Sequence, residues 1–332
     1  MRTRFALLCL TIILLGLASL AAPARATQSP TPTPTPIDPY AELTIEHLAG
    51  RFYGAGELTI QDTMATLPTF TRYLVSYPSD GLTIYGFMNV PTTRPGPYPV
   101  VIAVHGYVDP DDYDTLDYTT RYADALADAG FLVLHPNLRG YFPSNDGPNL
   151  FRVGMASDVL NLIGIVQQTG GLSGPLQQAN PRAIGLWGHS MGGGISLRAI
   201  TVNPSVRAAV LYGSMSGDEQ QNYTKIFEWS DGTRGRRELD VPESTLQAIG
   251  AIHHLERIQA AVSIHHGEND TLVPLDWSID LCLRLLELEK PVECYTYPGQ
   301  PHTFYGEGDA QLIARTITFF DQHLRQRPET LP

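Results

Sequence analysis

An alternation of two apolar patterns constrains the fold of this chain most strongly. From residue 99 onward, short continuous apolar segments alternate with longer segments in which apolar residues recur at helical spacing. This alternation indicates an α/β protein with a mainly parallel sheet and helices on both faces, because parallel neighbours must be connected across the sheet. Strands are expected at 99–106, 131–136, 183–188, 208–213, 261–267 and 292–297, and helices at 118–129, 155–166, 191–202 and 276–289.

Two segments depart from this alternation. Residues 71–77 and 82–90 read as strands joined by the turn sequence S-D-G, which is typical of a hairpin. Residues 214–257 contain no strand pattern, and a connection of that length in a compact domain is more often functional than idle. We therefore expect a lid or cap insertion over a site. A helical excursion without a role is the alternative.

The first residues have the layout of a cleaved secretory signal peptide. Arg2 and Arg4 precede an apolar run over residues 5–20, and A-R-A at 24–26 supplies small residues at a cleavage site. We predict that residues 1–26 are removed, which leaves a secreted or cell-envelope protein without stable membrane insertion. A retained membrane anchor is the alternative, and the shortness of the apolar run argues against it.

The rest of the chain has the composition of an acidic, exported globular protein. Residues 27–39 are rich in Pro and Thr, which favours an extended spacer, and residues 40–332 are expected to form one domain. The leader contains three of the 22 basic residues and none of the 34 acidic ones, so 19 basic residues remain and the formal charge is −15. Nucleic acids and anionic membrane surfaces select clustered Lys and Arg, so neither is an expected partner. Export also favours a disulfide between Cys282 and Cys294 over two free thiols.

The sequence G-H-S-M-G-G-G at 188–194 lies between an expected strand and an expected helix. A strand–turn–helix elbow of the form G-x-S-x-G holds its serine in a strained conformation at the carboxyl edge of the sheet, where the helix N-terminus favours negative charge. Ser190 is therefore the candidate nucleophile. A glycine-rich turn that only packs a helix closely on the sheet is the alternative.

A serine hydroxyl needs a base, and the base needs an orienting acid; in this architecture the acid comes next in the chain and the histidine last. Asp270 lies in the loop after the fifth expected strand, and His302 lies in the loop after the sixth. We predict a Ser190–Asp270–His302 triad, with Glu268 as the rival acid. The histidines expected to have packing or surface roles, rather than to bind a metal, are His253, His254, His265 and His266.

The oxyanion that develops during acyl transfer needs donors that are already in place. We predict two backbone N–H groups for this role: that of Met191, which starts the expected helix, and that of Tyr107, in the H-G-Y loop after the first expected strand. The candidate substrate contacts are the side chains of Tyr107, His189, Tyr212 and Trp229.

Four motifs now support a family resemblance. In this order, H-G-Y (105–107), G-H-S-M-G-G (188–193), H-G-E-N-D-T-L-V-P (266–274) and P-H-T-F (301–304) resemble the catalytic domain of prolyl oligopeptidase-like and dienelactone hydrolase-like α/β-hydrolases. The elbow is also similar to that of bacterial cutinases and polyester hydrolases, in which backbone amides of Tyr and Met form the oxyanion hole. The resemblance, over about residues 70–325, implies the α/β-hydrolase fold and the triad above. The chain departs from the first group because no β-propeller repeat is found in it, and from the second by its long interval between serine and acid.

The leading hypothesis is a secreted serine hydrolase that cleaves esters of small molecules or polymers through an acyl-enzyme, without a cofactor or metal. A peptidase with the same triad is the alternative, since the acidic loop at 109–114 would attract a substrate amine. That loop also reads as a solvated lead into a helix or as a calcium site. A non-catalytic binding module is the third hypothesis, and the filled triad positions argue against it.

Overall fold

The computed structural model describes residues 38–325 of the chain. The predictions of a signal peptide at 1–26 and of a spacer over most of 27–39 therefore lie outside the described residues. The contacts within the structure group the chain from Pro39 onward as a single unit.

Nine strands of the described chain form one sheet in the order β1-β2-β3-β5-β4-β6-β7-β8-β9. The pairs β1–β2, β2–β3 and β3–β5 are antiparallel, and every neighbouring pair from β5 to β9 is parallel. The mainly parallel sheet expected from the sequence is thus confirmed. The strands are β1 (Thr59–Thr66), β2 (Phe70–Ser79), β3 (Leu82–Pro91), β4 (Tyr98–Val104), β5 (Leu132–Pro136), β6 (Ala179–His189), β7 (Ala208–Tyr212), β8 (Ala261–Gly267) and β9 (Val292–Tyr297).

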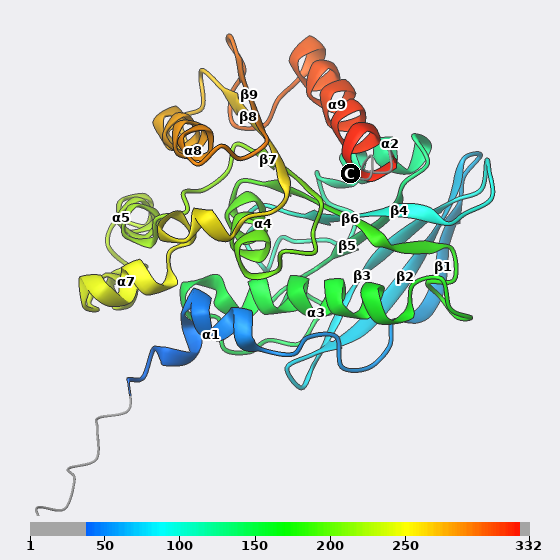
Figure 1. The fold of residues 1–332 in the computed structure, drawn as a ribbon, viewed down its shortest axis with the longest axis horizontal. Coiled ribbons are helices and arrows are strands. Elements are labelled where there is room, and N and C mark those ends of the chain that lie inside the picture. The colour runs from blue at the N-terminus through cyan, green and yellow to red at the C-terminus, as the bar shows by residue number, and fades with distance from the viewer. Residues whose placement is uncertain (1–37, 326–332) are drawn as a thin grey trace, which may run out of the picture. The chain divides into compact units, whose positions relative to one another are not determined.

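Helices cover both faces of this sheet (Figure 1). One apolar core lies between the sheet and α1, α3, α4 and α8, and a second lies between the sheet and α2 and α9. The connection from β7 to β8 holds three short helices and no strand, as expected for the 214–257 interval. The helices are α1 (Ile45–Gly50), α2 (Thr120–Asp128), α3 (Val153–Thr169), α4 (Met191–Val202), α5 (Glu219–Trp229), α6 (Arg236–Leu239), α7 (Glu243–Ile249), α8 (Leu275–Glu287) and α9 (Gly306–Phe320).

Strands β2 and β3 are the hairpin expected from S-D-G. Ser79 pairs with Leu82, which leaves Asp80 and Gly81 as the two turn residues. Their φ angles are 50° and 82°, so both lie in the left-handed region. A two-residue hairpin turn of this kind requires positive φ at both central positions, and Asp-Gly is among the sequences that tolerate it best.

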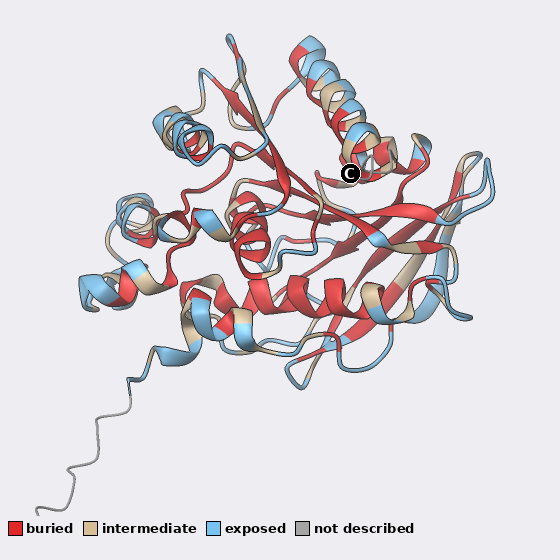
Figure 2. Cartoon of the chain, in the orientation of Figure 1, coloured by how far each residue is buried: buried red, intermediate tan, exposed pale blue. Residues whose placement is uncertain are grey.

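Helix α3 is a core helix. Every residue from Val153 to Val166 is buried, and Figure 2 shows the helix buried along most of its length. The segment Leu150–Thr169 is long and apolar enough to cross a membrane, but 83% of its 18-residue window is buried inside the protein. A core helix passes the same test of length and composition, so this segment gives no indication of a membrane span.

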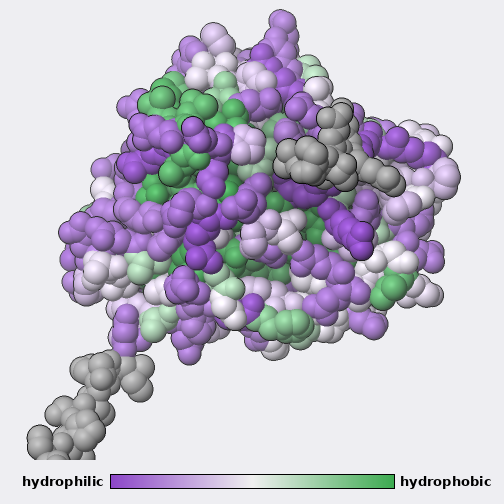
Figure 3. Space-filling model, viewed as in Figure 1, coloured by the Kyte–Doolittle hydropathy of each residue, from purple (hydrophilic) through white to green (hydrophobic). Residues whose placement is uncertain are grey.

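Helix α8 is joined to β9 by a disulfide between Cys282 and Cys294, whose Cα atoms are 6.4 Å apart. The bond expected from export is therefore formed in the structure. The same helix exposes Ile279, Leu283 and Leu286. These side chains recur at helical spacing and form an apolar stripe, which lies within the green area over α8 in Figure 3.

Candidate active site

Ser190 occupies the turn between β6 and α4. Its backbone has φ 56° and ψ −118°, which is a strained conformation for a residue with a side chain. The flanking glycines are sterically required, since a Cβ on Gly188 would lie 2.3 Å from the carbonyl oxygen of Gly192. A Cβ on Gly192 would lie 2.1 Å from the carbonyl oxygen of Val104. The turn therefore holds Ser190 at the carboxyl ends of the parallel strands, which is the geometry of a nucleophile elbow.

Asp270 and His302 are in contact, on loops that follow the neighbouring strands β8 and β9. His302 Nδ1 lies 2.6 Å from Asp270 Oδ2. The other carboxylate oxygen accepts hydrogen bonds from the N–H groups of Leu272 and Val273, both at 2.9 Å. The rival acid, Glu268, is exposed and hydrogen-bonds elsewhere. Asp270, not Glu268, is therefore the carboxylate that can orient His302.

His266 is a second imidazole against the same carboxylate. Its Nε2 lies 3.2 Å from Asp270 Oδ2, and its Nδ1 lies 2.7 Å from Ser278 Oγ. Burial tends to raise the pKa of Asp270, but the hydrogen bonds from His266 and His302 outweigh burial and hold that pKa below its ordinary value. From the sequence, His266 is expected to have a packing or surface role; its place at the strand end just before Asp270 is the only signal of this contact.

Ser190 and His302 line the same cavity, with the end of β7 between their loops. The Ser190 N–H donates to the carbonyl oxygen of Tyr212 at 2.9 Å, and a Cβ on Gly213 would lie 3.3 Å from His302 Nδ1. Among the described residues, no hydrogen bond joins Ser190 Oγ to His302. Such bonds are often long until substrate binds. The structure thus brings the three predicted residues to one edge of the sheet. The contact that is not formed in it is the hydrogen bond between Ser190 Oγ and His302.

The two predicted oxyanion donors belong to segments that adjoin Ser190. Helix α4 starts at Met191, so the Met191 N–H is one of the first-turn donors that have no partner within a helix. The loop after β4 also packs against the serine, because a Cβ on Gly106 would lie 3.1 Å from the Ser190 Cβ. Tyr107 follows Gly106 directly, so this loop carries the second candidate donor.

Ser190 and His302 line a cavity of about 1830 Å³. It exceeds the roughly 300–1,000 Å³ that is usual for small-ligand pockets. Two segments supply much of its lining. We call residues 138–155 the Arg139 wall, and residues 218–240, which form part of the expected lid, the cap segment.

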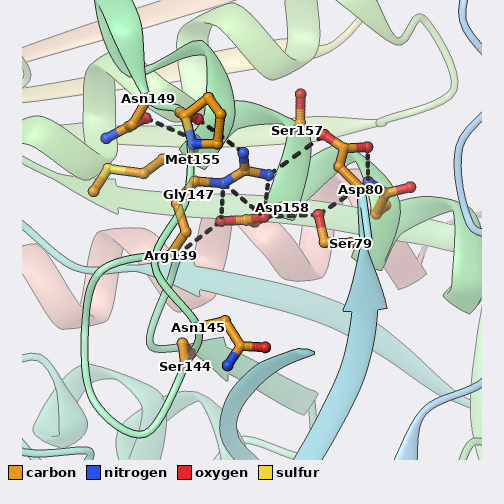
Figure 4. A network of polar contacts seen from close by, with 12 residues as sticks. Ser79, Asp80, Arg139, Ser144, Asn145, Gly147, Asn149, Met155, Ser157 and Asp158 are labelled. Carbon is orange, nitrogen blue, oxygen red and sulfur yellow. Dashed lines mark hydrogen bonds and ion pairs between the residues drawn. The ribbon is translucent and has the colours of Figure 1, made fainter. Parts of the chain in front are cut away.

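The Arg139 wall is tied to helix α3 by a buried ion pair (Figure 4). Nε and Nη2 of Arg139 donate to the carboxylate of Asp158 at 2.8 to 3.2 Å. The Ser79 hydroxyl donates to the same carboxylate at 2.7 Å, and Arg139 Nη1 donates to the carbonyl oxygen of Pro148 at 2.9 Å. Because these bonds are charge-assisted and shielded from water, they fix this side of the cavity.

The cap segment has a buried root and an exposed contact. At its root, Glu219 accepts hydrogen bonds from Arg152, at 3.2 Å, and from Arg198, and these side chains are largely buried. Further along, Arg234 Nη1 donates to the hydroxyl oxygen of Tyr107 at 2.6 Å. The Arg234 guanidinium also lies 5.6 Å from the centre of that ring. The cap segment therefore reaches the residue that carries one of the candidate oxyanion donors.

The predicted substrate contacts have different surroundings. Tyr107 and Trp229 line the cavity and are 50% and 44% exposed. His189 lines it too, but only 1% of it is exposed and both ring nitrogens have protein partners. The prediction for Tyr212 is wrong, because this residue is fully buried and its hydroxyl accepts a hydrogen bond from the Phe304 N–H at 2.5 Å. Tyr212 supports the site from within the core.

The remaining histidines and the acidic loop lie in different surroundings. In the part of the chain that the structure describes, no group of three or more His, Cys, Asp or Glu side chains is arranged to hold an ion. The loop at 109–114 contributes Asp109 to the cavity, but the calcium alternative gains no support. His265 is buried and hydrogen-bonded within the core, and His253 and His254 lie in or beside short 3-10 turns.

Comparison with known families gives a consistent assignment. Residues 99–240 match the family described as alpha/beta hydrolase fold, and residues 175–327 match the prolyl oligopeptidase family. The uncharacterized peptidase YtmA of Bacillus subtilis is 26% identical over 247 residues, which cover 73% of this chain and 90% of the relative.

Two solved structures share the fold at low sequence identity. A puromycin-hydrolyzing peptidase of Mycobacterium tuberculosis superposes with a TM-score of 0.63 at 20% identity, over 81% of this chain and 42% of the peptidase. Acetyl xylan esterase 1 of Thermoanaerobacterium sp. JW/SL YS485 superposes with a TM-score of 0.60 at 18% identity, over 85% of this chain and 93% of the esterase. The chain thus spans less than half of the peptidase and nearly all of the esterase. The elbow, the sheet topology and the first family match agree on an α/β-hydrolase fold, and residues 175–327 are similar to the prolyl oligopeptidase family.

Proposed function

We propose that this chain is an exported serine hydrolase that cleaves carboxylic esters through an acyl-enzyme intermediate. The observation that carries the proposal is a strained, glycine-flanked Ser190 in one cavity with the hydrogen-bonded pair Asp270–His302. Together these elements can turn a weak hydroxyl into a nucleophile. The layout of residues 1–26 and the disulfide at Cys282 support export.

In the proposed mechanism, His302 removes the proton from Ser190 Oγ as that oxygen attacks the ester carbonyl carbon. Asp270 accepts a hydrogen bond from the Nδ1–H of His302, which leaves Nε2 free to act as the base and stabilises the imidazolium that forms. The N–H groups of Tyr107 and Met191 stabilise the oxyanion. His302 then protonates the departing alcohol. In the second half of the reaction, His302 removes a proton from water as the water oxygen attacks the acyl carbon, and returns this proton to Ser190 Oγ as the bond between the acyl group and Ser190 breaks and the acid leaves. The lowered pKa of Asp270 supports this role, because the carboxylate stays ionised at neutral pH.

The size of the cavity supports substrates larger than acetyl esters of small alcohols. At about 1830 Å³ it has room for a bulky acyl or alcohol group, or for a segment of a polyester. The aromatic side chains of Tyr107 and Trp229 would then contact the substrate.

Peptide hydrolysis is the second candidate function. The prolyl oligopeptidase family match and the relative named as a peptidase favour it, and Asp109 on the cavity could pair with a substrate amine. Esters and amides with the same acyl group separate the two candidates, because an esterase hydrolyses the amide far more slowly. Turnover of aminoacyl amides at rates close to those of the esters would favour the peptidase.

The direct test of the nucleophile uses Ser190→Ala. We expect this variant to lose at least about 10⁴-fold of the hydrolysis of p-nitrophenyl esters and all labelling by a fluorophosphonate. Ser205→Ala, at an exposed serine, is the control and should keep both. Labelling of Ser190→Ala would reveal a different nucleophile. A wild-type protein that hydrolyses no ester or amide and resists the probe would instead indicate a binding module.

A further inference from the structure

A chain of hydrogen bonds beside the predicted triad has no part in the mechanism above. The Tyr118 hydroxyl oxygen lies 3.0 Å from the Gly106 nitrogen and 2.6 Å from His189 Nδ1. His189 Nε2 lies 3.0 Å from the carbonyl oxygen of His302. The chain therefore connects the loop of the candidate oxyanion hole to the backbone of the residue that supplies the base.

The direction of each hydrogen bond follows from the protonation of His189. Burial, together with the charge that His302 can carry, lowers the pKa of His189 to about 3, so its ring is neutral and has a single N–H. A carbonyl oxygen only accepts hydrogen bonds, so this hydrogen lies on Nε2, facing His302. Nδ1 then accepts from the Tyr118 hydroxyl, and the Tyr118 oxygen accepts from the Gly106 N–H. One arrangement of hydrogens satisfies all three contacts.

The Gly106 peptide is also held from its carbonyl side. His105 Nδ1 lies 2.7 Å from the Gly106 carbonyl oxygen. This oxygen belongs to the planar peptide unit that carries the Tyr107 N–H, and in a trans peptide the two groups point in opposite directions. Fixing the oxygen therefore fixes the direction of the candidate oxyanion donor. No side chain fits at Gly106, since a Cβ there would lie 2.4 Å from the Tyr118 hydroxyl oxygen.

We propose that Tyr118 and His189 are positioning residues that hold the oxyanion loop and the His302 loop in a fixed mutual register. The proposal rests on the proposed function, because the register matters only if the Tyr107 N–H and the His302 imidazole act on one substrate. Small displacements of preorganised groups reduce rates strongly, so the relative position of the two loops determines how well the transition state is stabilised. His189 thus acts through the backbone of His302 and does not need the substrate contact expected from the sequence.

Tyr118→Phe tests the proposal because it removes the hydroxyl and keeps the ring. For a p-nitrophenyl ester we expect kcat to fall about 10- to 100-fold while KM stays within about twofold, since the oxyanion forms only in the transition state. Tyr98→Phe is the matched control: it removes a buried hydroxyl that donates to the Pro91 carbonyl oxygen at 2.9 Å, outside the cavity lining, and should keep kcat within about twofold. An effect of Tyr118→Phe on KM alone, or equal losses in both variants, would overturn the proposal.

Substitutions of His189 test whether the chain acts as one unit. His189→Gln retains a donor for the carbonyl oxygen of His302, whereas His189→Leu does not, so we expect the Gln variant to keep more of kcat. Combining Tyr118→Phe with His189→Leu should lower kcat about as much as the worse single change, because both break the same chain. Losses that multiply would show that the two side chains act separately and would contradict the proposal.

Nitrogen-15 NMR of the histidine rings in the wild-type protein provides a readout that does not depend on activity. We expect His189 to carry hydrogen on Nε2, with a bare Nδ1, and to show no titration between about pH 5 and pH 9. If the enzyme is active but His189 titrates in this range or has the opposite tautomer, the positioning role is rejected and the proposed function is not. A wild-type protein without hydrolytic activity would reject the proposed function, whatever the tautomer of His189.

Discussion

The two sides of the cavity are attached to the rest of the molecule in different ways. The Arg139 wall is tied to helix α3 through side chains that are only 4% and 0% exposed. The far part of the cap segment reaches the oxyanion loop through one exposed contact, between Arg234 and Tyr107. Buried charged hydrogen bonds are strong and specific, whereas exposed contacts contribute little to stability. We infer that the Arg139 wall sets the shape of the cavity and that the cap segment changes its position when a substrate binds.

Hydrogen exchange should show the largest difference between the two sides. We expect the Arg139 amide of the wall, which donates to the buried Asp158 carboxylate at 2.9 Å, to exchange only through global unfolding, and the amides of residues 230–240 through local opening at almost no free-energy cost. The two opening free energies should differ by about 5 kcal/mol or more. Exchange of the native protein followed by mass spectrometry measures both segments at once. Equal protection of the two segments would contradict the inferred difference between the Arg139 wall and the cap segment.

Asp158→Asn should have the next largest effect, because it removes the buried carboxylate 2.8 Å from the Arg139 guanidinium and leaves only the longer contact with Asp80, at 3.4 Å. We expect the free energy of unfolding to fall by about 3–5 kcal/mol in denaturant titrations. Asp146→Asn is the control on the same wall; this side chain is exposed and should change stability by less than about 0.5 kcal/mol. A similar small effect in both variants would mean that the ion pair does not anchor the wall.

Glu219→Gln tests the root of the cap segment. The change removes the carboxylate shared by Arg152 and Arg198, and we expect a loss of about 2–3 kcal/mol in the free energy of unfolding. Limited proteolysis should become faster within the cap segment. Glu228→Gln, on the same helix, removes an exposed carboxylate and should change neither measurement. Faster cleavage outside the cap segment would show that Glu219 does not anchor this segment.

Arg234→Ala should have the smallest effect on stability. Since the contact with Tyr107 is exposed, we expect the free energy of unfolding to change by less than about 1 kcal/mol. Release of the cap segment should raise kcat/KM for a bulky acyl ester relative to a short one, and esters of graded acyl length measure this ratio. Lys225→Ala is the control: this cation is half-buried, and its ion pair among the described residues is with Glu228 on the same helix. An unchanged ratio in Arg234→Ala would indicate that the contact does not limit access.

Burial decides which elements of the fold could be predicted from the sequence. Strands β4 to β8 are buried along most of their length, so they appear as continuous apolar runs. Strand β1 was not predicted, because nearly all of its residues are exposed and no apolar alternation marks it. Helix α1 is six residues long, which is too short for a periodic pattern.

The residues of the candidate site also differ in whether the sequence predicts them. Ser190, Asp270 and His302 could be predicted because each occupies a fixed place after a strand end. Tyr118 was instead assigned to a helix, yet α2 begins only at Thr120 and the Tyr118 side chain turns back to Gly106. Contacts of this kind depend on how separate loops fold over one another, and nothing in local residue spacing encodes them.

The disulfide between Cys282 and Cys294 has a consequence for catalysis as well as for the fold. Helix α8 starts five residues after Asp270, and β9 ends five residues before His302, so one covalent link spans the segment between the two loops. Molecules matured in a reducing cytosol would share residues 27–332 with molecules exported as proposed and yet hold these loops together by packing alone. The compartment in which the polypeptide matures would thereby influence its turnover number.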